Sequence, residues 1–201
     1  MSGKPLGRRF FQRPTLELAP ALLGTWLCRR RGADIVRGRI VEVEAYTDDG
    51  ASHAREGRRT PRNTIVFGHA GYAYVYFTYG MHYCANVVAE RDGIPGAVLL
   101  RGLDGIADAH GPARLCRALD IDKRLDGVDL TAGDQLWIEP GRRRAGERIV
   151  QTTRIGIRRA VDLPWRFYLA GSPGVSRRDR AAEAIHATSW KPPQRNRVRP
   201  A

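Results

Sequence analysis

The chain has 201 residues, of which 34 are Lys or Arg and 21 are Asp or Glu, so its formal net charge is +13. A hydrophobic content of 42% and a charged content of 27% are those of an ordinary globular protein and exclude a disordered or fibrous chain. No apolar run approaches the roughly 20 residues of a membrane span, and residues 1–9 lack the apolar stretch of a secretory signal. We therefore expect no membrane contact and a cytoplasmic location, associated with the nucleoid if the source is bacterial.

The positive charge is almost entirely arginine, because lysine occurs only at Lys4, Lys123 and Lys191. The arginine guanidinium matches the geometry of phosphates and bases, so a basic chain of this kind favours a polyanion such as nucleic acid as its partner. A GC-rich genome would also enrich arginine over lysine, so composition leaves both explanations open.

The length is typical of one domain. We expect a flexible basic segment at 1–9, a single domain at 10–184 and a basic, proline-containing tail at 185–201, where arginines and prolines alternate without an apolar period.

Two short helices and a series of strands are predicted in chain order. Proline near the start and an apolar run predict helices at 20–23 and 112–119. Segments rich in β-branched and aromatic residues, separated by Gly, Asp and Pro, predict strands at 27–30, 35–46, 72–78, 82–90, 97–103, 137–139, 154–158 and 166–169. This order of elements indicates an α+β fold, with a single compact domain built on a mostly antiparallel, curved sheet with flanking helices.

The predicted strand at 35–46 carries acidic residues among apolar ones. The two-residue period of a strand places Glu42, Glu44 and Tyr46 on one face and Val41 and Val43 on the other. Two explanations remain open: an edge strand with a solvated polar face, or a carboxylate and an aromatic ring that share the wall of a catalytic site.

Arg101 lies within an apolar strand. A guanidinium in such a strand needs a carboxylate or phosphate partner, because an unpaired buried charge is costly. Glu44 is one candidate, and either a structural ion pair or a functional one fits the pattern.

Alternating tyrosines lead into a predicted hairpin. Tyr74 and Tyr76 share one strand face, and a tight turn at Tyr79–Gly80 would present Tyr79 and Met81 at a protruding tip. A tyrosine stripe is most often part of a core, but large apolar side chains at a tip suit a wedge that enters the DNA minor groove.

The combination of several segments, and their order along the chain, is distinctive. They are Glu42 to Tyr46, Ala51 to His53 with Arg58 to Asn63, Tyr74 to Tyr76, Tyr79 to Met81, Leu99 to Arg101, Gly111-Pro112 with Leu115-Cys116, and Arg166 to Tyr168 with Gly171 to Pro173. From about Phe10 to Arg180 they resemble the alkyladenine (3-methyladenine) DNA glycosylases. Gly174 departs from that pattern, in which tryptophan is usual, and His82 stands where an aromatic residue is usual.

The resemblance implies a monofunctional glycosylase without lyase activity, metal or other cofactor. Its partner would be double-stranded DNA that contains damaged purines: 3-methyladenine, 7-methylguanine, hypoxanthine or ethenoadenine. The enzyme would flip the base out of the duplex and hydrolyse its N-glycosidic bond with water, which leaves an abasic site. We expect a monomer, because the sequence has no exposed heptad pattern.

The resemblance also implies roles for single residues. Glu44 would be the general base for the attacking water, Arg101 would orient that water, and a main-chain carbonyl near Ile155 would complete its site. Tyr46 would stack on one face of the purine.

On the other face of the purine, Tyr76 and His53 would pack, with support from Tyr74. The His53 backbone N–H would donate to the acceptor at position 6, and Asn86 would crowd the 2-amino group of guanine. Tyr79 would fill the gap left by the flipped nucleotide, with Met81 beside it. The candidate phosphate contacts are Arg58, Thr60, Arg62 and His82.

Two other functions are open at this level. A non-catalytic damage-recognition protein could use the same wedge and charge. A metal-dependent nuclease could use Glu44, Asp48 and Asp49 around Mg²⁺, although Asp48 and Asp49 fall in a predicted loop, where a solvated turn is the more ordinary explanation.

Overall fold

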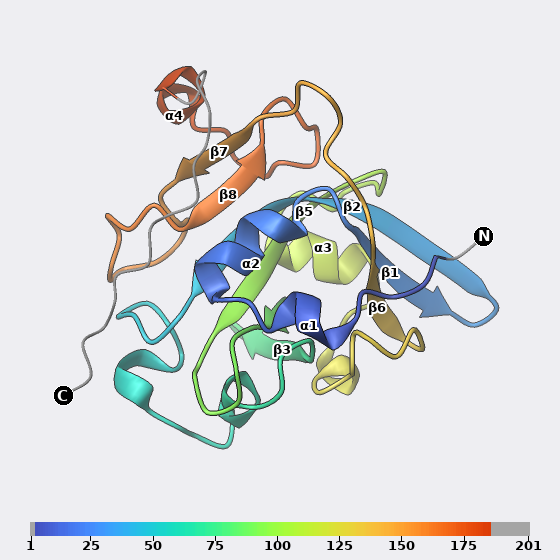
Figure 1. Ribbon diagram of the computed structural model, residues 1–201, viewed down its shortest axis with the longest axis vertical. Coiled ribbons are helices and arrows are strands. Elements are labelled where there is room, and N and C mark those ends of the chain that lie inside the picture. The colour runs from blue at the N-terminus through green and yellow to red at the C-terminus, as the bar shows by residue number, and fades with distance from the viewer. Residues whose placement is uncertain (1–2, 186–201) are drawn as a thin grey trace.

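A computed structural model of the protein describes residues 3–185 (Figure 1). Of the tail predicted at 185–201, only Ile185 is among them. Within these residues the strands are β1 (Trp26–Arg31), β2 (Asp34–Tyr46), β3 (Ala73–Thr78), β4 (His82–Val88), β5 (Ala97–Asp104), β6 (Leu136–Glu139), β7 (Ile149–Thr152) and β8 (Arg166–Leu169). The helices are α1 (Arg8–Phe11), α2 (Thr15–Leu22), α3 (Pro112–Ala118) and α4 (Arg180–Ile185), with 3₁₀ turns at Arg55–Gly57, Thr64–Phe67 and Lys123–Leu125. None of the helices in this part of the chain has the length and apolar character needed to cross a bilayer.

All strand pairs are antiparallel, and the sheet order is β3-β4-β5-β2-β1-β6, with β8 paired to both β2 and β7. The long strand β2 organises this sheet. Its first half pairs with β1, its second half pairs with β8, and β5 runs along its other edge. Irregular register near Glu42 interrupts the β2–β5 pairing, and such bulges bend a strand. The predicted α+β class and the single, curved antiparallel sheet are thus confirmed.

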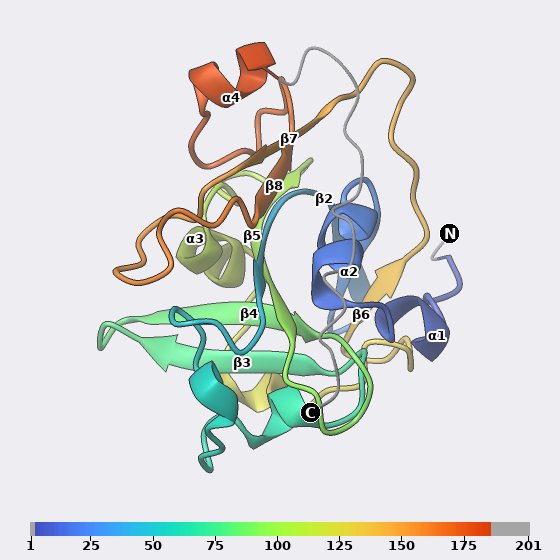
Figure 2. The same ribbon diagram turned by 60° about the vertical axis from the view of Figure 1, so that its left-hand side comes forward.

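Helices cover β5 from two sides, and α2 also packs on β2. α2 and α3 lie on opposite sides of β5 (Figure 2). Leu18 and Leu22 of α2 and Leu115 of α3 are fully buried, as are the residues of β2 from Ile40 to Ala45. Since β2 is a central strand covered on both faces, the interpretation of 40–46 as an edge strand with a solvated face is wrong.

Two predicted elements are wrong in position. α2 begins at Thr15 rather than at Pro20, because Leu18, Ala19 and Leu22 already form a buried helical stripe and the proline falls near the helix end. No strand forms at 154–158. The strand lies instead at β7, and Gly156, with φ of +76°, turns the chain away from the sheet.

The hairpin predicted around Tyr79–Gly80 is confirmed. Thr78 pairs with His82, and Tyr79 and Gly80 have φ of +51° and +67°, which closes a three-residue turn between β3 and β4. Tyr79 is 80% exposed and Met81 is 69% exposed. The turn extends from the body of the domain at the left of Figure 2. The hairpin therefore presents two large side chains to solvent.

The described part of the N-terminal segment contacts the domain. The Leu6 N–H donates to the Ile138 carbonyl, and Arg8 pairs with Asp129 and donates to the Ala70 carbonyl. These contacts hold Leu6 and Arg8 on the domain, whereas the sequence predicted a flexible segment up to residue 9.

Gly174 lies directly against β5. A Cβ on Gly174 would be 2.3 Å from the Leu103 carbonyl oxygen, and a Cβ on Gly102 would be 2.2 Å from the Gly174 oxygen. The Gly174 N–H donates to Asp104 at 2.8 Å. Only glycine fits here, so the departure at Gly174 from the family pattern is a packing requirement of this chain.

We predict that Gly174→Ala lowers the free energy of unfolding by about 2 kcal/mol, the usual cost of overpacking a tight contact. Urea denaturation measures it. The control is Gly7→Ala, where φ is −74° and nothing lies within 4 Å of the added Cβ. The free energy of unfolding of Gly7→Ala should stay within about 0.5 kcal/mol of the wild-type value. Equal stabilities of the two variants would contradict the packing account.

Candidate active site

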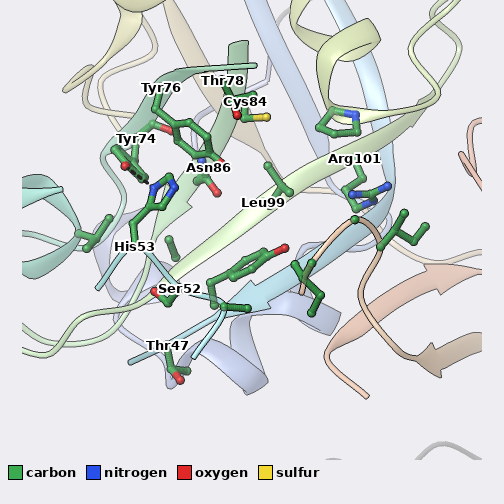
Figure 3. A pocket seen from close by; sticks show the side chains of 18 of the residues that line it. Thr47, Ser52, His53, Tyr74, Tyr76, Thr78, Cys84, Asn86, Leu99 and Arg101 are labelled. Carbon is green, nitrogen blue, oxygen red and sulfur yellow. Dashed lines mark hydrogen bonds between the residues drawn. The ribbon is translucent and has the colours of Figure 1, made fainter. Parts of the chain in front are cut away.

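A cavity of about 380 Å³ opens between the end of β2, the β3–β4 hairpin and β5 (Figure 3). This volume is in the range of small-molecule binding sites. The sequence-predicted residues that line it are Tyr46, His53, Tyr74, Tyr76, Tyr79, Asn86, Arg101 and Ile155. Residues from five separate segments thus meet in one pocket.

Aromatic rings form one wall of the pocket. The rings of His53 and Tyr76 meet edge to face with centroids 4.5 Å apart, and those of Tyr74 and Tyr76 are 5.2 Å apart. His53 Nδ1 and the Tyr74 hydroxyl are 2.8 Å apart, the hydrogen bond drawn in Figure 3. The Arg62 guanidinium lies 5.3 Å from the centroid of Tyr76 and donates to the Phe77 carbonyl. This wall is therefore fixed from both sides.

Tyr46 forms another wall, and Arg154 stacks on its ring, with 4.6 Å between the guanidinium carbon and the ring centroid. Arg154 is not among the pocket-lining residues, so the guanidinium packs behind the ring. Its position is fixed by the Ala45 carbonyl and by a bidentate pair with Asp49. Burial alone would raise the pKa of Asp49, but the hydrogen bonds from Arg154 and Ala51 outweigh this effect, so the pKa is lowered overall. Asp49 thus neutralises Arg154.

The Glu44 side chain is fully buried beside the pocket, with partners for both oxygens. The Tyr46 hydroxyl donates to Oε2 at 2.8 Å, and the Ile155 N–H donates to Oε1 at 2.8 Å. Arg101 Nη1 lies 3.3 Å from Oε1. The Glu44–Arg101 pair predicted from the sequence is confirmed, and the carboxylate has one fixed orientation.

Arg101 has a second carboxylate partner, because its Nε lies 3.2 Å from Oε1 of Glu42. The buried Glu42 also accepts hydrogen bonds from Arg166 at 3.1 Å and from the Ser176 N–H at 2.6 Å. Two carboxylates and two guanidiniums therefore form one buried cluster with balanced formal charge.

Protonation states follow from these contacts. Burial alone would lower the pKa of Arg101, but the Glu44 and Glu42 carboxylates raise it above its ordinary value, so the guanidinium stays charged. Burial and the adjacent Glu44 carboxylate raise the pKa of Tyr46 far above its ordinary value. Tyr46 therefore stays a hydrogen-bond donor to Glu44.

The DNA-contact candidates lie outside the pocket, apart from Tyr79. Met81 and His82 border a separate groove beside α3. Arg58 and Arg62 are exposed, and the Thr60 N–H donates to Asn63. The structure thus divides the predicted residues into a pocket group and a surface group.

Several residues that hold the site were missed: Glu42 as a buried ligand of Arg101, Arg154 behind Tyr46, Asn63 on the His53 carbonyl, and Arg166 and Ser176 on Glu42. The sequence did contain a signal for Arg166. This arginine directly precedes the apolar residues Phe167, Tyr168 and Leu169, so, like Arg101, it needs a charged partner if it is buried. The sequence has no comparable signal for Ser176.

Comparison with known proteins agrees with this site. A profile of the methylpurine-DNA glycosylase family matches residues 9–173. A protein of Synechococcus elongatus is 50% identical over 178 residues, which cover 85% of this chain and 90% of that protein. One of Carboxydothermus hydrogenoformans is 44% identical over 190 residues, covering 86% and 99% respectively. Both have the name "Putative 3-methyladenine DNA glycosylase".

The chain therefore belongs to the methylpurine-DNA glycosylase family, as its sequence resemblance indicated. It is a DNA glycosylase of the 3-methyladenine, or methylpurine, type, a hydrolase that acts on N-glycosidic bonds of DNA.

We predict that Glu42→Gln lowers the free energy of unfolding by about 3 kcal/mol, because removing one charge from a buried cluster leaves a guanidinium undercompensated. The matched control is Asp120→Asn, which removes a surface partner of Arg31 and should cost less than about 1 kcal/mol. Urea denaturation of both variants measures the difference. A Glu42→Gln protein as stable as the control would contradict a cluster that depends on this charge.

We also predict that His53 is neutral at pH 7. Burial lowers the pKa of its imidazole, and the Arg62 and Arg55 guanidiniums lower it further. An NMR titration should place its midpoint below the ordinary value of about 6.5. Arg62→Gln should move the midpoint upward. Arg59→Gln, which removes a guanidinium stacked on Phe67, should not. A wild-type midpoint at or above about 6.5 would contradict the assignment.

Proposed function

We propose that the enzyme flips an alkylated or deaminated purine out of double-stranded DNA into this pocket and hydrolyses its N-glycosidic bond with an activated water. The product is an abasic site for base excision repair. The substrate class comprises 3-methyladenine, 7-methylguanine, hypoxanthine and ethenoadenine. The observation that carries the proposal is the oriented Glu44–Arg101 pair at the edge of an aromatic-walled cavity.

The flipped base stacks between Tyr46 and the wall formed by Tyr76 and His53. Every purine has a π-face, so stacking admits many lesions, and selection depends on hydrogen bonds at the base edge. Within the described residues the backbone N–H of His53 has no hydrogen-bond acceptor, which leaves it available to the acceptor at position 6 of the base. Asn86 is fixed by the Tyr74 carbonyl at 3.0 Å and crowds the 2-amino group of guanine.

Glu44 acts on the water that attacks the sugar. Its carboxylate takes a proton from the water while the water oxygen bonds to C1′, and the electron pair of the broken bond leaves with the purine. The negative charge also stabilises the cationic sugar of the transition state. Arg101 and the main chain at Ile155 orient the water. A cationic alkylated purine leaves without an added proton, which favours such lesions.

The hairpin tip replaces the flipped nucleotide. Tyr79 enters the gap in the stack and Met81 lies beside it in the minor groove, while Arg58, Thr60, Arg62 and His82 contact phosphates. Flipping costs a few kcal/mol, and less for a mispaired base, so the wedge and pocket together need to offset only that amount.

The chemistry uses no cofactor and no lyase step, and the enzyme acts as a cytoplasmic monomer. A lyase step needs an amine nucleophile, and the pocket-lining residues in the described part of the chain include no lysine. The nuclease alternative loses one of its ligands, because the Asp49 carboxylate pairs with Arg154.

The test is single-turnover release of base from a duplex with one hypoxanthine or one 3-methyladenine, in EDTA, followed by alkali. We expect free base and strand cleavage only after alkali. Cleavage without alkali would indicate a lyase. Activity that stops in EDTA would indicate a nuclease, and tight binding without base release would indicate a damage-recognition protein.

We predict that Tyr79→Ala slows excision more from a stable pair than from a mispair, by about tenfold, because flipping a paired base costs more. Single-turnover rates for hypoxanthine opposite cytosine, with which it pairs stably, and opposite thymine, with which it forms a weaker wobble pair, measure the difference. The control is Phe77→Ala, an exposed aromatic side chain on the same hairpin that is not at the turn. Equal slowing on both duplexes would contradict the wedge role.

A further inference from the structure

A second cavity, of about 540 Å³, adjoins the active site. Its lining is strongly basic: Thr153, Arg154, Ile155, Gly156, Arg166, Arg177, Arg178, Asp179 and Arg180. Ile155 and Gly156 also line the pocket described above. The two cavities therefore meet at the segment whose N–H binds Glu44.

The arginines of this cavity fall into two groups. Arg154 and Arg166 are buried and paired with carboxylates. Arg177, Arg178 and Arg180 are exposed, and within residues 3–185 their guanidiniums have no hydrogen-bond or carboxylate partner. The second group is thus free to bind an anion.

The acidic residue of the cavity does not neutralise this group. The Asp179 carboxylate accepts hydrogen bonds from the Ala182 N–H and the Thr152 hydroxyl. Both hydrogen bonds lower the pKa of Asp179, and the one from Ala182 has the larger effect. The carboxylate is therefore ionised, but its oxygens are occupied by these local hydrogen bonds. One carboxylate against three exposed guanidiniums leaves the cavity positive.

The backbone that carries these arginines is fixed to the active site. The Ser176 N–H donates to Glu42, the Arg177 carbonyl accepts from Arg166, and the Asp179 N–H donates to the Tyr168 hydroxyl. A fixed backbone lowers the entropy cost of binding, because only the side chains need to be ordered.

We propose that Arg177, Arg178 and Arg180 form a phosphate-binding site for the DNA strand that carries the excised nucleotide. This proposal rests on the proposed function. With the base in the pocket and C1′ beside Glu44, the strand must leave the pocket mouth within one nucleotide, and the basic cavity begins at Ile155. Guanidinium groups match phosphate oxygens in geometry and charge.

The first measurement is the salt dependence of binding to a duplex with one tetrahydrofuran abasic-site analogue. Arg177→Gln, Arg178→Gln and Arg180→Gln are compared with wild type, and removal of each phosphate contact should reduce the slope of log K against log salt by about 0.9. The control is Arg143→Gln, an exposed arginine in a groove beside α2. The groove of Arg143 shares no lining residue with the active-site pocket or with the basic cavity, so Arg143 lies outside the proposed site. The helix α2 beside it lies across β5 from α3 (Figure 2).

The second measurement replaces single phosphates around the analogue with neutral methylphosphonates. At a phosphate bound by Arg177, Arg178 or Arg180, the replacement should weaken DNA binding by the wild type but leave DNA binding by the corresponding arginine variant unchanged. Additive losses at every position would overturn the proposal, as would unchanged slopes or an equal loss of slope in Arg143→Gln. Base release by wild type is measured in parallel: its absence would overturn the proposed function, whereas normal release with unchanged slopes would overturn the phosphate site alone.

Discussion

The structure depends on one buried guanidinium that is shared by two carboxylates. Arg101 lies 3.2 Å from Glu42 and 3.3 Å from Glu44, and both acids are fully buried in β2. Burial of such charges is costly unless every one is paired and hydrogen-bonded. Arg101 thus links the stability of the sheet to the orientation of the carboxylate at the pocket.

The remaining contacts of the cluster explain why the sheet has its particular connections. β8 pairs with the second half of β2 and brings Arg166 to Glu42. The close approach of Gly174 to β5 allows the following turn to place Ser176 on the same carboxylate. The segment after β7 then supplies Ile155 to Glu44. Elements far apart in the sequence therefore converge on two acids of one strand.

Local patterns in the sequence predicted most of the strands, the hairpin turn and the need of Arg101 for a carboxylate. The family resemblance predicted the members of the pocket. The burial of Glu42 was not predictable, because its two-residue period with Glu44 fits a solvated face equally well, and only pairing with β5 and β8 decides it. Likewise, 154–158 has β-forming residues, but Arg154 turns inward to Asp49 and Tyr46, a contact that depends on distant parts of the chain.

We propose that Glu44 activates water without being needed to bind the lesion. Glu44→Gln keeps the shape and removes the charge, and its single-turnover excision of hypoxanthine should be compared with its affinity for the same duplex. We expect excision to fall by at least about a hundredfold, the contribution of a general base, while the affinity stays within about threefold. Undiminished excision by Glu44→Gln would contradict the account.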